Sequence, residues 1–533
     1  MPPARAAPAL PSLPSSRLLP ASRPRNAPEP MRDRTLVLSV LIVASCGLGY
    51  ELIAGALSSY LLGDSILQFS SIIGCYLFAM GVGSWLSRYV KDEDVLARFI
   101  DIEILIGLLG GVSAALLFVV FAWLSAPFRT ALYALVFVLG VLVGMEIPLV
   151  MRVLNARRNA FSELVSRVLT FDYLGALAVS LVFPLVLAPR LGLSRTGFLF
   201  GMLNAGVALV TIHIFRAELK AVVPRLLRAS LVLALLAGGF LGSGQLTHWA
   251  ERGMFGDEII HSESTPYQRL VITRWKDDLR LYINGNLQFS SRDEHRYHEA
   301  LVHPLLQALP WARRVLVIGG GDGLAAREIL KHRNIEHVTL VDLDPAMTTL
   351  FSRSAPLVAL NRGSLTDARV RVVNADAAQW LEQHDDMFDA IVVDLPDPSN
   401  FGLGKLYSVP MYRLLAHHLA EKGYAVVQST SPYFAPRSFW DIDATLREAG
   451  LHTWPYHAYV PSFGEWGFIL AGKRADYTPP THYDVPMKFL DADSTALMFR
   501  FPADMAPREA RANRLNEQTL VHDFEQDWRN VIR

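Results

Sequence analysis

The sequence predicts a multi-span α-helical membrane domain, followed by a small antiparallel β-domain and an α/β domain with a mostly parallel sheet. Three observations lead to this fold class. Apolar stretches of near-spanning length recur from residue 35 to about residue 246. Residues 267–289 alternate as strands do and contain a tight-turn signal. After Trp311, short apolar strands alternate with helices, which is typical of a parallel sheet covered on both faces.

Composition excludes several classes of function. The chain has 533 residues, which is enough for two or three domains. Its formal net charge is zero, so nothing indicates a nucleic-acid partner or a polybasic membrane tether. The two cysteines, Cys46 and Cys75, both lie in apolar runs. The soluble half therefore has neither a disulfide framework nor a cysteine-based zinc site.

The first thirty residues differ from the rest of the chain. Residues 1–30 are rich in Pro, Ala, Arg and Ser, and they lack the apolar core and cleavage signal of a secretory peptide. We predict that they are disordered. Met31 stands directly before the first apolar run, so Met1 and Met31 are both candidate start sites.

The membrane domain is predicted over residues 31–248, which implies a multi-pass protein of the cell (inner) membrane with the lipid bilayer as a partner. A helix needs roughly 20 apolar residues to cross the hydrocarbon core. The sequence gives about seven such stretches, with an error of one: 35–57, 69–86, 100–124, 131–150, 171–188, 197–215 and 229–246.

Basic residues are unevenly distributed among the loops. By the positive-inside rule they place the N-terminus in the cytoplasm, and seven spans would then leave the soluble half outside. A cytosolic metabolite as substrate favours the cytoplasm, and on that ground we expect the soluble half there. The loops that follow the first, third and fifth spans carry only Arg129, Arg190 and Arg195. The segments before the first span and after the second, fourth and sixth spans carry Arg32, Arg34, Arg88, Lys91, Arg98, Arg152, Arg157, Arg158, Arg167, Arg216, Lys220, Arg225 and Arg228.

Three acids lie within or at the edge of the predicted spans: Glu51, Glu146 and Asp172. Charged groups in a membrane are costly and are candidates for function. Two interpretations stay open. Each acid pairs with a neighbouring Arg, Tyr or backbone group near the interface, or the three form a cation path or sensor. Several glycines of the spans are predicted to allow close helix packing: Gly47, Gly49, Gly81, Gly83 and Gly110.

The soluble half begins with a predicted β-domain over residues 257–290, in which Asn284-Gly285 marks a tight turn. A helix over residues 293–308 follows. It carries His295, His298 and His303, which suggest a metal cluster. With no cysteine nearby and the neighbouring acids needed elsewhere, we expect no metal there.

The α/β region is predicted from strands at 315–318, 338–341, 370–373, 390–393 and 424–428, with helices at 324–332, 345–351, 377–383 and 409–420 between them. Ligands of such sheets bind at the carboxyl ends of the strands. A series of acids falls at those ends: Asp322, Asp342, Asp344, Asp376, Asp394 and Asp397.

These acids suit a nucleoside and a cationic substrate, whereas phosphate needs N–H donors and basic side chains. The glycine-rich turn at 319–323 is a weak signal alone. An acid at the end of the next strand, Asp342 or Asp344, can accept from both ribose hydroxyls. Leu324-Ala-Ala326 stands where a third glycine would fall, which disfavours NAD. Asp376 is predicted either to contact an adenine amino group or to cap a helix.

Five motifs occur in order and at proper spacing, and together they resemble the polyamine aminopropyltransferases, the spermidine synthase family, over roughly residues 265–470. The fusion to a multi-span region resembles the membrane-bound bacterial branch. The resemblance implies a Rossmann-like fold of the nucleosyl-methionine-dependent methyltransferase type over 291–475, a C-terminal extension over 476–533, and a homodimer or homotetramer. The motifs are Thr265-Pro-Tyr-Gln268, Asn284-Gly-Asn-Leu-Gln288, Asp293-Glu-His-Arg-Tyr-His-Glu299, Gly319-Gly-Gly-Asp-Gly323 and Asp394-Leu-Pro-Asp-Pro398.

The resemblance also implies residue roles. Asp394 would be the catalytic proton acceptor, and decarboxylated S-adenosylmethionine would be a co-substrate, with no cofactor and no metal. The amine would be held by Tyr297, His298, Asp322 and Asp397. The donor nucleoside would be held by Gln268, Gly319, Gly321, Asp342, Asp376 and Ala377.

The chemistry is consistent with these roles. A sulfonium activates its neighbouring carbon, but a protonated amine is not a nucleophile, so a carboxylate must accept its proton. Further acids orient the amine and lower the entropic barrier to attack. We therefore predict spermidine synthesis from putrescine. Two alternatives stay open: a methyltransferase on an unknown acceptor, and a membrane polyamine transporter or sensor with a synthase-like regulatory domain.

The sequence departs from the family pattern in two places. Leu395-Pro396 replaces the usual small polar pair between the two acids, and Phe463 stands where many relatives have an amine-binding Tyr. Glu465 or Trp466 is expected to compensate for the missing hydroxyl. These departures bear on the identity of the amine acceptor more than on the donor.

Overall fold

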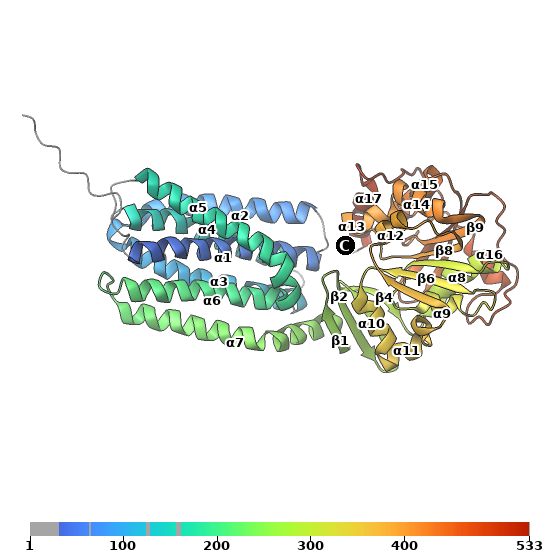
Figure 1. The fold of residues 1–533 in the computed structure, drawn as a ribbon, viewed down its shortest axis with the longest axis horizontal. Helices are drawn as coiled ribbons and strands as arrows, with labels where there is room; N and C mark the ends of the chain where they lie inside the picture. Colours follow the sequence, from blue (N-terminus) through green and yellow to red (C-terminus); the bar gives the residue numbers. More distant parts are fainter. Residues whose placement is uncertain (1–30, 63–65, 124–127, 156–160, 532–533) are drawn as a thin grey trace, which may run out of the picture.

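The computed structural model describes residues 31–62, 66–123, 128–155 and 161–531. The predicted disordered segment 1–30 lies outside these residues, as do Arg157 and Arg158. The described chain has two parts, an elongated helical bundle and a soluble part built on two sheets (Figure 1).

The predicted spans coincide with the long helices that the structure describes, with two differences. The span 171–188 crosses from one helix through the turn Phe183–Leu187 to the first residue of the next, and the span 197–215 extends one residue past its helix. Residue 124 lies outside the described residues. Apolar runs of this length keep every backbone N–H and C=O paired within a helix. The helices are α1 (Met31–Leu62), α2 (Ile66–Leu86), α3 (Val95–Trp123), α4 (Phe128–Asn155), α5 (Phe161–Val182), α6 (Ala188–Ile214) and α7 (Val222–Phe255).

Six helices of the described chain are long and apolar enough to cross a membrane. One of them is long enough to contain two spans. It runs over Val165–Ile214, 50 residues, and contains α5, a π-helical turn at Phe183–Leu187 and α6. A straight helix of that length would span about 75 Å, more than twice the hydrocarbon core. Gly192 breaks it with φ 76° and ψ 170°, and the chain then turns back (Figure 1). The described bundle therefore makes seven passes.

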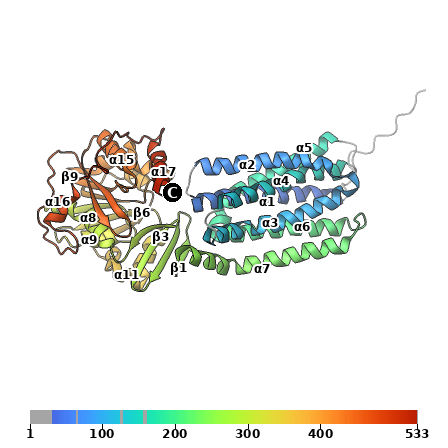
Figure 2. The same ribbon diagram turned by 180° about the vertical axis from the view of Figure 1, so that it is seen from behind.

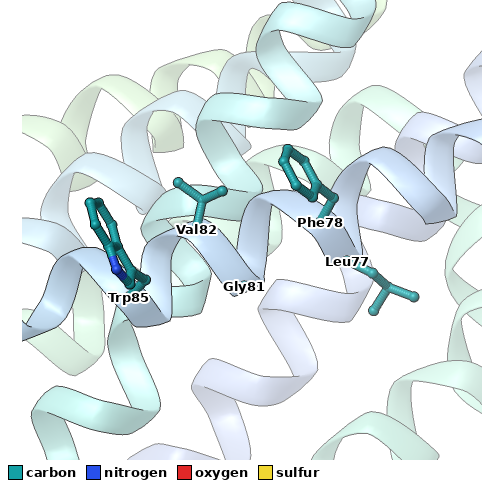
Figure 3. Close-up of a pocket in the computed structure, with 5 residues that line it drawn as sticks. All are labelled: Leu77, Phe78, Gly81, Val82 and Trp85. Carbon is teal, nitrogen blue, oxygen red and sulfur yellow. The ribbon is translucent and has the colours of Figure 1, made fainter.

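Close packing of α2 on α4 depends on glycine. A Cβ added to Gly83 would lie 1.9 Å from the carbonyl oxygen of Val141, so the two backbones touch at that point. The packing prediction is wrong for Gly81, where an added Cβ would meet nothing within 4 Å. Gly81 instead belongs to an apolar depression on the outer surface of α2 (Figure 3), lined also by Leu77, Phe78, Val82 and Trp85.

Because the chain runs along the bundle an odd number of times, it enters and leaves the bundle at opposite ends. Figures 1 and 2 both show α1 beginning at the end of the bundle that is far from the soluble part. α7 reaches the soluble part and leads directly into its first strand.

The first sheet has four antiparallel strands in sequence order: β1 (Glu258–Ser264), β2 (Arg269–Trp275), β3 (Asp278–Ile283) and β4 (Asn286–Ser290). Asn284 and Gly285 join β3 to β4 with φ of 50° and 83°, the positive values that a two-residue hairpin turn requires. The predicted tight turn is confirmed.

The second sheet has seven strands in the order β10-β11-β9-β8-β5-β6-β7. Its five parallel strands are the predicted ones, and β10 and β11 add an antiparallel edge. The bounds are β5 (Arg314–Gly319), β6 (His337–Asp342), β7 (Val370–Asn374), β8 (Phe388–Asp394), β9 (Leu419–Gln428), β10 (His452–Val460) and β11 (Gly464–Gly472).

Alternate residues of the central strands pack into two different cores, as the two-residue period of a strand requires. Val315 and Val317 face a core shared with α8–α11, whereas Leu316 and Ile318 face a core shared with α12, α14 and α15. The helices are α8 (Glu294–Gln307), α9 (Leu324–Ile329), α10 (Pro345–Arg353), α11 (Ala355–Asn361), α12 (Ala377–Gln383), α13 (Phe401–Gly404), α14 (Val409–His418), α15 (Pro436–Glu448), α16 (Ala492–Met498) and α17 (Thr519–Val531).

Candidate active site

The candidate site lies where the order of the parallel strands reverses. β5 is followed outward on one side by β6 and β7, and on the other by β8 and β9, so β5 and β8 flank the switch point where such sheets bind ligands. Gly319 at the end of β5 is in register with Asp394 at the end of β8. A Cβ at Gly319, whose φ is 80°, would lie 2.1 Å from the carbonyl oxygen of Asp394, so only glycine fits.

The glycine loop and the acid of the next strand form one unit. The backbone N–H groups of Gly321 and Asp344 donate to the Asp342 carboxylate at 3.0 and 2.9 Å. Burial raises the pKa of Asp342 to about 6, although these hydrogen bonds oppose the rise. The residue is half-buried.

Asp344 has a different task from Asp342. It caps α10 by accepting from the backbone N–H of Ala346 at 3.0 Å, and it also accepts from Gln268 Nε2 at 2.9 Å and Thr265 Oγ1 at 2.8 Å. Its side chain is buried and fully engaged. Of the two acids considered for the ribose, Asp342 is less buried and has fewer side-chain partners, and its contact with a ribose stays a prediction.

Asp376 caps a helix, which was one of its two predicted roles. It accepts from the backbone N–H groups of Ala378 and Gln379 at 3.0 and 3.2 Å, and Ala377 is the first residue of that helix. Lys405 also pairs with it at 3.1 Å. Burial raises the pKa of Asp376, but the Lys405 and amide hydrogen bonds outweigh burial and lower it. Its contact with adenine stays a prediction.

Asp394 is held by a tyrosine. The Tyr297 hydroxyl donates to Asp394 Oδ1 at 2.6 Å, and the Tyr297 ring lies between the rings of Phe463 and Phe468, at 6.4 and 5.3 Å between centroids. Burial raises the pKa of Asp394, while His298 and Tyr297 act in the opposite direction. This arrangement fixes one carboxylate oxygen and leaves the other for a proton.

His298 supplies a positive charge to this acidic site. Its Nδ1 contacts Glu294 Oε2 at 2.8 Å. Burial lowers its pKa, but the hydrogen bond and charge of Glu294, with the charges of Asp322 and Asp394, raise it to about 9. His298 is therefore an imidazolium at neutral pH. It lowers the pKa of Asp322, which burial nevertheless raises to about 6.

Asp397 is held by two side chains that sequence reasoning missed. Gln428 Nε2 and Thr430 Oγ1 donate to its two carboxylate oxygens at 3.0 and 3.1 Å. Burial raises the pKa of Asp397 to about 6 against these hydrogen bonds. Gln428 is the last residue of β9, so its position beside Asp397 is set by the sheet.

A buried ion network behind the site was also missed. Arg327 donates to both carboxylate oxygens of Glu294 at 2.8 Å and to Glu328 at 2.9 Å. Glu328 contacts His303 Nε2 at 2.7 Å. His298 and His303, two of the three histidines considered for a metal, thus face different acids. In the described residues no three His, Cys, Asp or Glu side chains are grouped to hold a metal ion.

Glu146 lies beside a second buried acid of the bundle. Glu146 on α4 and Glu103 on α3 are both buried, and their carboxyl groups are in hydrogen-bonding contact. Glu103, which sequence reasoning missed, also accepts from Asn204 Nδ2 at 3.2 Å. Glu51 and Asp172 are half-buried.

Glu465, one of the two residues expected to compensate for Phe463, is paired with another side chain. Its carboxylate contacts His457 Nδ1 at 2.8 Å, on the neighbouring strand. The Trp466 ring packs on Phe463 at 5.2 Å between centroids, and its indole Nε1 is buried without a partner in the structure. Because an indole N–H donates but cannot accept, compensation by Trp466 for the missing hydroxyl stays a prediction.

A glycine loop joined to a strand-end acid, beside acids gathered around a tyrosine and an imidazolium, defines a Rossmann-type transferase acting on a cationic acceptor. Residues 294–479 match the family model of the spermine/spermidine synthase domain. Polyamine aminopropyltransferase 1 of Ralstonia nicotianae is 67% identical over 515 residues, which are 95% of this chain and 98% of that protein. The chain therefore belongs to the polyamine aminopropyltransferases and is an aminopropyltransferase.

Two further similarities are more distant. The polyamine aminopropyltransferase of Leptospira interrogans is 49% identical over 501 residues, 93% of this chain and 99% of that protein. The crystal structure of spermidine synthase from Thermotoga maritima covers 46% of this chain and 85% of its own, at 24% identity and a TM-score of 0.43. Family membership implies a polyamine and decarboxylated S-adenosylmethionine as substrates. The resemblance predicted from the motifs is confirmed.

Proposed function

We propose that this aminopropyltransferase moves the aminopropyl group of decarboxylated S-adenosylmethionine to putrescine, giving spermidine and methylthioadenosine. The observation that carries the proposal is the charge of the site. Asp322, Asp394 and Asp397 suit ammonium groups. The cations nearby, His298 and Arg327, are already paired with Glu294. The carboxylate of intact S-adenosylmethionine would therefore find no available cation beside Asp322.

In the proposed mechanism, the amine nitrogen attacks the carbon next to the sulfonium. A C–N bond forms, the C–S bond breaks, and methylthioadenosine leaves as a neutral thioether. Asp394 accepts the proton of the amine, with its other oxygen held by Tyr297. Asp322 and Asp397 bind ammonium groups and orient the substrates for in-line attack. The leaving group is good enough that the mechanism uses no metal or cofactor.

Methylthioadenosine release tests the proposal. We expect purified full-length protein in detergent, at pH 8 where acids of pKa about 6 are ionised, to release it only when decarboxylated S-adenosylmethionine and a diamine are both present. Putrescine should give the highest kcat/KM of a diamine panel.

Two outcomes would contradict the proposal. A higher kcat/KM for another amine would change the acceptor, and transfer of methyl from the intact donor would indicate a methyltransferase. The relatives above are named aminopropyltransferases, so the methyltransferase and the transporter or sensor gain no support from them. A homodimer or homotetramer stays a prediction.

We further propose that the chain is a multi-pass protein of the cell (inner) membrane. The apolar length of the helices and the apolar outer surface of α2 (Figure 3) support insertion in lipid. The odd number of passes supports a topology in which the soluble part and the start of α1 lie on opposite sides of the membrane. Loop charge favours the outside for the soluble part, and supply of the donor favours the cytoplasm.

Cysteine labelling tests this topology, because the soluble part has no cysteine of its own. In a Cys75→Ser background, we expect a membrane-impermeant maleimide to label only one of the two variants Lys91→Cys and Lys422→Cys, both at exposed positions. Labelling of Lys422→Cys gives an outside active site, and labelling of Lys91→Cys gives a cytoplasmic one. Labelling of both from the same side would contradict the odd number of passes.

A further inference from the structure

The C-terminal extension is part of the active site's support. Residues 480–533 follow the matched family domain, which ends at residue 479. They return to the α/β domain and end in α17, which Figures 1 and 2 show on the side of that domain facing the bundle. Asn513, in the segment before α17, is fully buried.

Asn513 binds the segment that follows the catalytic acids. Its side-chain Nδ2 donates to the carbonyl oxygens of Gly404 and Tyr407 at 2.9 and 3.1 Å. Its backbone carbonyl oxygen accepts from the backbone N–H of Val409 at 3.0 Å. Its backbone N–H donates to Thr445 Oγ1 at 2.9 Å. The Asn513 side chain thus holds both carbonyls of a tight turn, and its backbone N–H links that turn to α15.

Helix α17 closes over the same turn. A Cβ added to Gly404 would lie 2.4 Å from Val521 Cγ2, so the helix rests directly on the glycine. Gly404 is itself buried. The extension therefore contacts this turn through a hydrogen-bonding side chain and through an apolar surface.

Tyr407 of this turn bonds the peptide between the two proposed catalytic acids. The Tyr407 hydroxyl donates to the carbonyl oxygens of Pro396 and Leu395 at 3.0 and 3.3 Å, and Tyr407 is fully buried. Leu395 and Pro396 are the only residues between Asp394 and Asp397. Tyr407 therefore holds the peptide between both acids, together with Gln428 Nε2, which donates to the Leu395 carbonyl at 2.8 Å. The carbonyl of Tyr407 is in turn held by the extension.

We propose that Asn513 is a positioning residue for the amine side of the reaction, acting through Tyr407 on the peptide between Asp394 and Asp397. The proposal rests on the proposed roles of those two acids. The arrangement explains how Leu395-Pro396, which departs from the family pattern and lacks polar side chains, is nevertheless held by hydrogen bonds to its backbone carbonyls.

Two variants test the two ends of this path in the full-length protein. Asn513→Asp keeps the shape but replaces the Nδ2 donor with a carboxylate oxygen that faces two carbonyls. Tyr407→Phe removes only the hydroxyl. We expect each to lower kcat/KM for the amine by about tenfold or more, with the Kd for methylthioadenosine of Tyr407→Phe within twofold of wild type. Because both act on one path, the double variant should be less than additive.

Arg514→Met is the matched control. Arg514 follows Asn513 but pairs with Glu448 at the surface, at 2.9 Å, and its kcat and KM should match wild type. Each rate is a ratio to wild type with whichever amine turns over, so a wrong acceptor assignment does not affect the result. A less stable Asn513→Asp with wild-type kcat and amine KM would overturn the proposal. If Asn513→Asp does not fold, a folded and fully active Tyr407→Phe would overturn it equally.

Discussion

The variant Asp394→Asn is expected to lose turnover by about 10² to 10⁴-fold while it still binds methylthioadenosine. An amide accepts a hydrogen bond from Tyr297, so the local geometry is kept, but it cannot accept a proton from the attacking amine. Burial raises the pKa of Asp394, so ionising this carboxyl in the folded protein costs free energy above its unfolded pKa of about 3.9. The neutral variant should therefore be at least as stable as wild type at pH 7.

Single-turnover rates and a methylthioadenosine Kd measure this prediction. The control is Asp389→Asn on the same strand, because Asp389 accepts from the backbone N–H groups of Arg313 and Arg314 at the opposite end of β8. It should retain wild-type rates. Turnover by Asp394→Asn within tenfold of wild type would remove Asp394 from the role of proton acceptor.

Arg327→Met is expected to be strongly destabilising. Arg327 is 9% exposed and bonds two buried carboxylates, Glu294 and Glu328. Removing it takes a shared partner from two buried carboxylates that keep only their contacts with His298, His303 and Lys331, and breaking such a buried pair costs up to about 3–5 kcal/mol. Thermal unfolding of the full-length protein should show a fall in Tm on the order of 10 °C.

The pH dependence separates this electrostatic loss from a packing defect. Burial raises the pKa of Glu294, but His298 and Arg327 together lower it to about 2. Such a carboxylate contributes stability above its unfolded pKa of about 4.3, and the contribution disappears as the pH falls toward 2. The difference between Arg327→Met and wild type should therefore be largest at pH 7 and smaller at pH 4.

Arg314→Met is the control for the second prediction, since Arg314 pairs with Asp386 where both side chains are nearly half exposed. Its effect should stay within about 0.5 kcal/mol. A deficit of Arg327→Met that is the same at pH 4 and pH 7 would show that lost packing, and not unpaired charge, dominates.

Local patterns determined much of this protein. The helix and strand order, the Asn284-Gly285 turn and the acids at the strand ends follow from apolar periodicity and from residues within a few positions of one another. Because parallel strands present their carboxyl ends at one edge, the sequence predicted that Asp342 and Asp394 lie at the edge of the sheet where ligands bind. The roles of the donor-site and amine-site residues stay predictions.

Tertiary structure alone decided the contacts between distant segments. The carboxyl contact of Glu103 with Glu146 and the reach of Asn513 to Tyr407 each depend on which faces of two elements meet. Asn513 is 106 positions from Tyr407, and no local pattern encodes that pairing. The same reason explains Gly81: its place on α2 was predictable, but whether it faces another helix or the outside depends on how α2 rotates against α4.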